Sequence, residues 1–313
     1  MKTKNLINLA AILIAVIGFS TTGCKKDKTT DTTTTTTDNS SLQQLSKDDN
    51  QLENASNEAL DDVNSFASRG ASKSILSLPC NVTITDSTST VDSTKITLTF
   101  NGNNCANTKY RTGQIEYSKK ISEHWKDAGT SINVKFINYK VTKISTGKSI
   151  TINGTKKFQN VSGGLIIDLG TTATSVVHKV TGNIQVTFDD NTTRTWSIAR
   201  QRTYTGTFPS QLVLTVDGFG TADGYNNLVS WGTNRNGELF YAQITQSVVR
   251  KQVCGFDPAS GILIYQIPST GKKATITFGY DDNNQVITGN DCPTRYKLDW
   301  ELNGNSGTIY IQL

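Results

Sequence analysis

The chain has 313 residues, a formal net charge of +5 at pH 7 and only two histidines. Two histidines exclude most zinc sites and most Ser-His-Asp triads, and the charges are scattered rather than gathered in an arginine-rich run. The sequence also lacks a Gly-x-Ser-x-Gly elbow, a His-Glu-x-x-His pair, a phosphate-binding glycine loop and a Cys-x-x-Cys pair. We therefore expect no nucleic-acid partner, no cofactor and no metal, and we find no signature of catalysis.

The N-terminus has the three parts of a secretory signal. Lys2 and Lys4 give a basic start, residues 6–19 are almost entirely apolar, and small residues lead into Cys24. An apolar run of this length is too short to cross a bilayer comfortably, because a membrane-spanning helix needs about 20 apolar residues. We therefore predict that residues 1–23 are a signal peptide that is removed on export.

The junction before Cys24 resembles the lipobox of bacterial lipoproteins, with Thr21 where the commonest pattern has leucine. This loosened pattern, followed by the charged residues 25–28, is similar to that of lipoproteins of the Bacteroidota. The resemblance implies diacylglycerol on the Cys24 sulfur and an acylated new N-terminus, and several acyl chains anchor a protein stably where one does not. The alternative is an ordinary cleaved signal followed by a chance cysteine. We expect a lipid-anchored protein of the cell envelope, at the outer membrane on its periplasmic or its outer surface.

Residues 24–41 consist mainly of lysine, aspartate and threonine, including six consecutive threonines at 32–37. Such a segment has almost nothing apolar to bury, so it cannot offset the entropy cost of ordering. We predict a disordered tether that lifts the body from the membrane by up to roughly 50 Å.

One helix is predicted near residues 47–68, within a spacer segment at 42–70. Apolar residues recur there every seven positions, at Leu45, Leu52, Ala59 and Phe66. Ser46 stands where an N-cap is expected, and Arg69-Gly70 is a suitable end. We expect a spacer helix that lies on the body or is only partly formed, and the alternative is a coiled coil or a helix for a partner.

Residues 71–313 carry a net charge of +7, from 24 basic and 17 acidic residues, and show the period of two that is typical of strands. Ile132, Val134 and Phe136 alternate with polar residues, and the alternation then slips by one residue from Ile137 onward, which predicts a β-bulge. Polar turn signals recur at short intervals. We predict an all-β body of roughly fourteen strands, packed as a large antiparallel sandwich or flattened barrel, in one domain or two fused halves.

Four cysteines remain after Cys24, an even number that favours two disulfides in an oxidising compartment. Three connectivities are possible. We favour Cys80–Cys105 and Cys254–Cys292, because each pair brackets a hairpin and is followed by an arginine and a strand. Each bridge closes a loop of tens of residues and stabilises by roughly 3–4 kcal/mol in the chain-entropy model.

A candidate ligand patch follows from the strand at 176–188, whose apolar face includes His178. A simple hairpin register sets Tyr204 opposite His178, Arg202 opposite Val180, and Arg200 opposite Gly182. His178, Arg200, Arg202 and Tyr204 would then form a patch for an anion or a sugar. The alternative, which we favour, makes the arginine stems a cover for the sheet rim and His178 a hydrogen-bonded core residue.

Two weaker acid–base candidates lie elsewhere. His124 has Glu123 and Asp127 nearby in the sequence, which could tune it as an acid or base, although an exposed loop histidine is the simpler interpretation. Asp299 and Glu301 share one face of a strand, an arrangement that some β-sandwich glycosidases use, although two solvated carboxylates are the simpler interpretation.

Residues 217–224 combine acids and glycines in the manner of a calcium loop, but they lack the further acidic ligands of an EF-hand. We expect a tight double turn there.

The sequence favours a non-catalytic binding or structural module, for glycan or another envelope protein. The alternative is a hydrolase acting on polysaccharide. An enzyme requires His124, or Asp299 with Glu301, in a concave pocket, whereas a binding module requires only an open face with exposed tryptophan or tyrosine.

Overall fold

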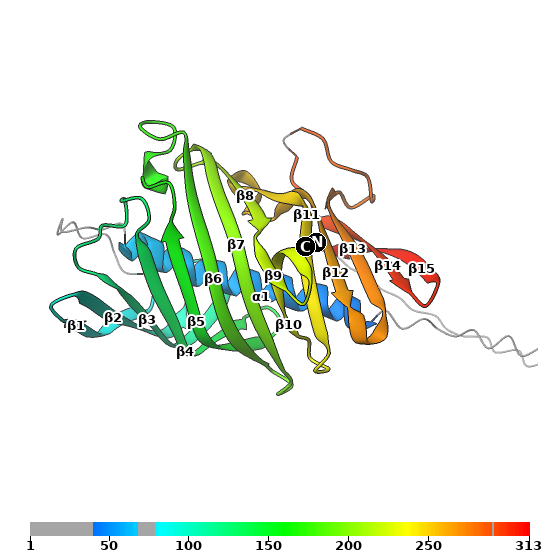
Figure 1. The fold of residues 1–313 in the computed structure, drawn as a ribbon, viewed down its shortest axis with the longest axis horizontal. Coiled ribbons are helices and arrows are strands. Elements are labelled where there is room, and N and C mark those ends of the chain that lie inside the picture. Colours follow the sequence, from blue (N-terminus) through cyan, green and yellow to red (C-terminus); the bar gives the residue numbers. More distant parts are fainter. Residues whose placement is uncertain (1–39, 68–78, 290) are drawn as a thin grey trace, which may run out of the picture. The chain divides into compact units, whose positions relative to one another are not determined.

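A computed structural model describes residues 40–67, 79–289 and 291–313, which form one antiparallel sheet with a long helix against it (Figure 1). The helix α1 spans Ser40–Ala67. The strands are β1 (Val82–Ser89), β2 (Ser93–Asn103), β3 (Lys109–Lys120), β4 (Ser131–Lys143), β5 (Ser149–Asn160), β6 (Ser175–Phe188), β7 (Thr193–Thr207), β8 (Gln211–Gly218), β9 (Gly220–Ala222), β10 (Tyr225–Thr233), β11 (Leu239–Lys251), β12 (Pro258–Ile267), β13 (Lys272–Tyr280), β14 (Arg295–Leu302) and β15 (Asn305–Gln312). Three short 3-10 turns are η1 (Ile166–Asp168), η2 (Gln252–Cys254) and η3 (Pro268–Thr270).

The sheet is a meander in which chain neighbours pair along β1 to β7 and along β10 to β15, with β1 and β15 at its two edges. The described residues form one compact unit rather than two halves. The all-β prediction is confirmed. Of the two packings expected, the flattened barrel is the nearer, because the described strands belong to one sheet that curves in a barrel-like way around α1, without a second sheet facing it.

One position in the sheet is shared by two strands. β8 pairs with the C-terminal parts of β7 and β11, while β10 pairs with the N-terminal parts of the same two strands. Between them lies the short strand β9, which pairs with β10 in the same sheet. Of the double turn expected at residues 217–224, the structure has a single turn, at Asp223 and Gly224, both at positive φ, and the residues before it belong to β8 and β9 apart from Phe219.

The predicted bulge is confirmed between β4 and its neighbours. The register between β4 and β5 shifts between Phe136 and Tyr139 of β4. The register between β3 and β4 shifts between Thr112 and Gln114 of β3. Asn138 lies in the left-handed region at φ 47°, and Gly113 faces it at φ 92°. The bulge turns Tyr139 onto the same buried side as Phe136, because it absorbs the one-residue slip in the alternation.

Helix α1 crosses the strands on one side of the sheet, which we call the inner face (Figure 1). Leu45, Leu52 and Ala59 are buried in the same apolar core as the strands, so this part of the predicted stripe is confirmed. The expectation that the helix lies on the body is therefore confirmed, although the helix begins at Ser40 rather than near residue 47. Ser46 is inside the helix, not at its N-cap, and its hydroxyl bonds the Tyr296 hydroxyl at 2.9 Å.

Both predicted disulfides, Cys80–Cys105 and Cys254–Cys292, are confirmed. The predicted signal peptide, Cys24 and the tether up to residue 39 lie outside the described residues, as does the side chain of Phe66, while Ser40 and Ser41 belong to α1. Among the described helices, none combines the length and the apolar character that a membrane span requires.

Replacing Gly113 tests the bulge. An added Cβ there would lie 2.1 Å from the backbone oxygen of Asn138, so we expect Gly113→Ala to cost about 3 kcal/mol or more in the free energy of unfolding. Gly147→Ala is the matched control, since Gly147 also has positive φ but has open space around its Cβ position, and we expect about 1 kcal/mol there. Denaturant unfolding measures both, and equal losses would contradict this account of the bulge.

Candidate functional site

The four residues of the predicted patch lie on one face, as expected, but in a different register. His178 pairs with Arg202, Val180 with Arg200, and Val176 with Tyr204. The offset of two residues arises because the β6–β7 turn is centred on Asp190, one residue earlier than the assumed centre at Asn191, so that Thr187 pairs with Thr193. A shift of two preserves the face, because side chains alternate with a period of two.

This face is the inner face, and it is covered. His178, Arg200, Arg202 and Tyr204 are all buried, so the hypothesis of an open ligand patch is wrong, and the favoured alternative, in which His178 is a core residue, is the nearer one. His178 packs between the rings of Trp125 and Tyr204, with centroids 5.0 and 5.5 Å away. Burial, with a contribution from Arg202, lowers its pKa to about 3. It is therefore a neutral core residue, although its Nε2 atom has no hydrogen-bond partner among the described residues.

The arginines are neutralised by carboxylates of α1, and Glu53 is the central one. Its Oε1 lies 3.0 Å from Arg200 Nη1 and 3.3 Å from Arg250 Nη2. Burial raises the pKa of this carboxyl, but surrounding cations outweigh that effect and lower it to about 2. In order of effect, these cations are Arg200, Arg250, Arg202 and Lys156.

One turn earlier in α1, two further carboxylates bind the sheet. Asp49 contacts Arg194 at 2.8 Å and accepts a 2.8 Å hydrogen bond from the Tyr265 hydroxyl. Asp48 accepts two hydrogen bonds of 2.7 Å from Arg235, in a bidentate pair. The bidentate geometry of an arginine fork is among the stronger charge-assisted arrangements in proteins.

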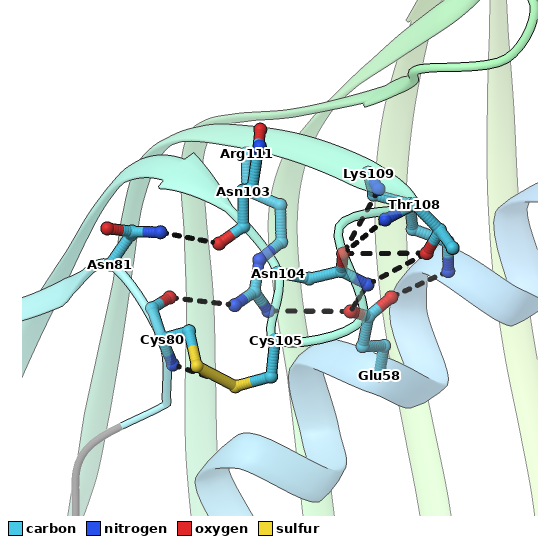
Figure 2. A network of polar contacts seen from close by, with 9 residues as sticks. All are labelled: Glu58, Cys80, Asn81, Asn103, Asn104, Cys105, Thr108, Lys109 and Arg111. Carbon is cyan, nitrogen blue, oxygen red and sulfur yellow. Dashed lines mark hydrogen bonds and ion pairs between the residues drawn. A yellow bond between two sulfur atoms is a disulfide. The ribbon is translucent and has the colours of Figure 1, made fainter.

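Near the other end of α1, Glu58 binds the region of the first disulfide (Figure 2). It lies 2.6 Å from Lys109 Nζ and 3.7 Å from Arg111 Nη1. Burial raises the pKa of Glu58, but the hydrogen bond and charge of Lys109, the Asn104 amide and Arg111 together lower it. Arg111 in turn donates to the backbone oxygen of Cys80 at 3.3 Å, so the helix, β3 and the disulfide form one network.

Two pockets lie beside α1 in the part of the chain that the structure describes. A cavity of about 30 Å³ lies where β8 gives way to β10, lined by Glu53, Arg200, Ser230 and Arg250 among others. That volume suits one or two waters rather than an organic ligand. A larger pocket of about 320 Å³ lies at the start of α1, but the carboxylates that line it, Asp48 and Asp190, are already paired with Arg235.

The weaker acid–base candidates are not brought together with other catalytic groups. The His124 side chain is 68% exposed in a loop, with Asp127 3.3 Å away. Asp299 is paired with Lys297 at 2.8 Å and accepts a hydrogen bond from Thr308. Partial burial raises the pKa of Asp299, but these two partners lower it overall. Glu301 is 64% exposed, and neither carboxylate lines the two pockets described above.

An aromatic cluster on the outer face, opposite α1, was not predicted. Ser230 faces Asp49 on the inner face, so the next residue, Trp231, points outward beside its cross-strand partner Tyr241. Tyr225 stacks on Tyr241 with ring centroids 4.3 Å apart.

The carboxylate of Asp223, in the exposed β9–β10 turn, accepts a hydrogen bond from the Tyr241 hydroxyl. That bond raises the Tyr241 pKa to about 12. The cluster of Asp223, Tyr225, Trp231 and Tyr241 thus joins an exposed acceptor to two partly exposed rings, those of Tyr225 and Trp231, and to the buried ring of Tyr241. The only sequence signal was the acid and glycine pattern at 217–224, which does not reveal the aromatic partners.

Within the described ranges, no three histidine, cysteine, aspartate or glutamate side chains gather closely enough to hold a metal ion. No protein-family model, curated protein or solved structure matches the chain.

Replacing Glu53 tests the charge pairing. We expect Glu53→Gln to lower the free energy of unfolding by about 3–5 kcal/mol, because two buried arginines lose their counter-charge. The folded-state pKa of about 2 is below the ordinary 4.5, so the Glu53 contribution is present above pH 4.5 and is lost as the pH falls towards 2. Glu53→Gln should therefore also flatten the acid limb of a stability–pH curve measured by denaturant unfolding.

Glu301→Gln is the control, since Glu301 is exposed and 3.7 Å from Lys273. Exposed pairs contribute little, so we expect no measurable change. A loss in Glu53→Gln no larger than in this control would contradict the assignment.

Proposed function

We propose that this chain is a lipid-anchored, non-catalytic module of the bacterial cell envelope that binds glycan through its outer-face aromatic cluster. The supporting observation is the exposed Asp223 beside the partly exposed Tyr225, which stacks on the buried Tyr241, with the partly exposed Trp231 adjacent. Sugar rings present C–H faces that pack on aromatic rings and hydroxyls that bond carboxylates, and tyrosine and tryptophan combine an apolar body with a polar tip.

The contacts on the inner face favour a structural role for that face and a binding role for the outer face. Its arginines, which would otherwise suit an anionic ligand, are occupied by Asp49, Glu53 and Glu58 of α1. The inner face therefore holds the fold together, and recognition belongs to the outer face. The carboxylates considered for hydrolysis are paired or solvated, which favours binding over catalysis.

The anchor follows from the resemblance of residues 21–24 to a lipobox. The described chain begins at Ser40, beside the β10–β11 turn and the start of β13. The Asp223–Trp231 cluster lies on the side of the sheet opposite α1, so the helix does not cover it.

Tyr225→Ala tests the glycan site. We expect it to weaken binding on a glycan array roughly tenfold, because an aromatic packing partner contributes about 0.5–1.5 kcal/mol. Tyr110→Ala is the matched control, because Tyr110 is an exposed tyrosine on β3, and it should bind as the wild type does. Wild-type protein that binds no glycan, or equal binding by both variants, would overturn the proposal.

Cys24→Ser tests the anchor. We expect the variant to leave the membrane fraction, because the acyl chains supply the membrane affinity. Mass spectrometry of the wild-type N-terminal peptide should find acylation on Cys24. A variant that stays in the membrane fraction would refute lipid anchorage through this cysteine without bearing on the glycan site.

A further inference from the structure

The two edges of the sheet differ in how well they are protected against pairing with another strand. At one edge, β1 has a shift in pairing between Ile84 and Asp86 and carries the charge of Asp86. Bulges and charges are the usual devices that keep an edge strand from pairing further. The other edge, β15, has neither.

The edge strand β15 runs for eight residues in unbroken register with β14, from Asn305 to Gln312. It contains no charged residue and no proline. Its side chains include Ile309 and Tyr310, and Ile309 is only partly buried against the core. A long, regular, uncharged edge of this kind is a template for an added strand.

The β14–β15 turn fixes which backbone groups point away from the sheet. Asn303 and Gly304 form a two-residue turn, both at positive φ, so Leu302 and Asn305 are a hydrogen-bonded pair. From there the odd-numbered residues of β15 bond to β14. The outward N–H and C=O groups belong to the even-numbered residues: Ser306, Thr308, Tyr310 and Gln312.

We propose that β15 pairs with β15 of a second copy of this chain, antiparallel and about a two-fold axis at Ile309. Two edge strands can form an antiparallel pair only if the residues whose N–H and C=O groups point away from one sheet lie opposite the corresponding residues of the other sheet. The axis at Ile309 sets Thr308 opposite Tyr310 of the second copy and Ser306 opposite its Gln312. With the axis at Ile309, each of the four outward-pointing residues has an outward-pointing partner in the second copy. With the axis at Tyr310, Ser306 has none. This self-complementarity is the reason to assign the edge to a second copy rather than to a foreign strand.

A single cysteine at the axis provides the test in the full chain, and it does not depend on the glycan site. Ile309 would face itself as a non-hydrogen-bonded pair, with Cα atoms about 4.5 Å apart, within the range for a disulfide. We expect Ile309→Cys to yield a covalent dimer on non-reducing electrophoresis of membranes or of purified protein. Thr308→Cys, Tyr310→Cys and, on the opposite edge, Ser87→Cys are the matched controls and should remain monomeric.

Charge substitution then tests the register in the Ile309→Cys background. In the double variant Thr308→Lys with Tyr310→Lys, a lysine at 308 of each copy lies opposite a lysine at 310 of the other, so there are two repulsive pairs. We expect roughly tenfold less covalent dimer because of these repulsions. Thr308→Lys with Tyr310→Glu sets lysine opposite glutamate and should restore the dimer. Circular dichroism and the Tm confirm that each variant folds.

Three results would overturn the proposal: no covalent dimer from folded Ile309→Cys, an equal yield from Ser87→Cys, or no difference between the two charge variants. A dimer obtained from Tyr310→Cys instead would overturn the axis at Ile309.

Discussion

The fold depends on the pairing of buried charges between α1 and the inner face of the sheet. Arg194, Arg200 and Arg250 point into a region where an apolar side chain would ordinarily be expected, and Asp49 and Glu53 make their burial possible. A buried ion pair adds little net stability over an apolar pair of the same volume, but it strongly penalises any arrangement that separates the partners. The pairs therefore fix where along the strands the helix lies, and the apolar contacts of Leu45 and Leu52 supply the favourable burial.

The division of one sheet position between β8 and β10 determines which side chains come together on the outer face. The connection between these strands runs through β9, and Gly220 passes so close to the Trp231 ring that an added Cβ would lie 2.6 Å from it. The following turn places Asp223 at the surface, and the chain returns through Tyr225, which stacks on Tyr241. An irregularity in the middle of a regular sheet thus concentrates polar and aromatic groups that an unbroken strand would have distributed along its length.

Strand periodicity was sufficient to predict the fold class and the bulge, because both depend on local sequence. The two disulfides were predicted from a pattern that both cysteine pairs share, a hairpin between the cysteines followed by an arginine and a strand. The face of His178, Arg200 and Arg202 was also predictable from the period of two. The covering of this face by α1 could not be predicted, because Glu53 is far in the sequence from Arg200 and Arg250, and no local pattern connects them. The start of the helix was misplaced for the same reason: Ser46 looks like an N-cap residue, yet it binds Tyr296 across the core. The outer-face cluster joins residues from β9–β10 and β11, a proximity set by pairing rather than by sequence pattern.

The position of α1 in the chain has a consequence for how the body is assembled. The helix precedes every strand, and its residues bind partners as far away as Tyr296, 250 positions later. Contacts of such long range slow folding, because the entropy of closing a large loop must be overcome before the contact forms. The helix is synthesised before the strands, and it has no complete face to bury against until β14 has joined the sheet. Until then its carboxylates Asp48, Asp49, Glu53 and Glu58 lack their partners on the strands and in the β10–β11 turn, and in the finished body the same groups hold the helix to the sheet.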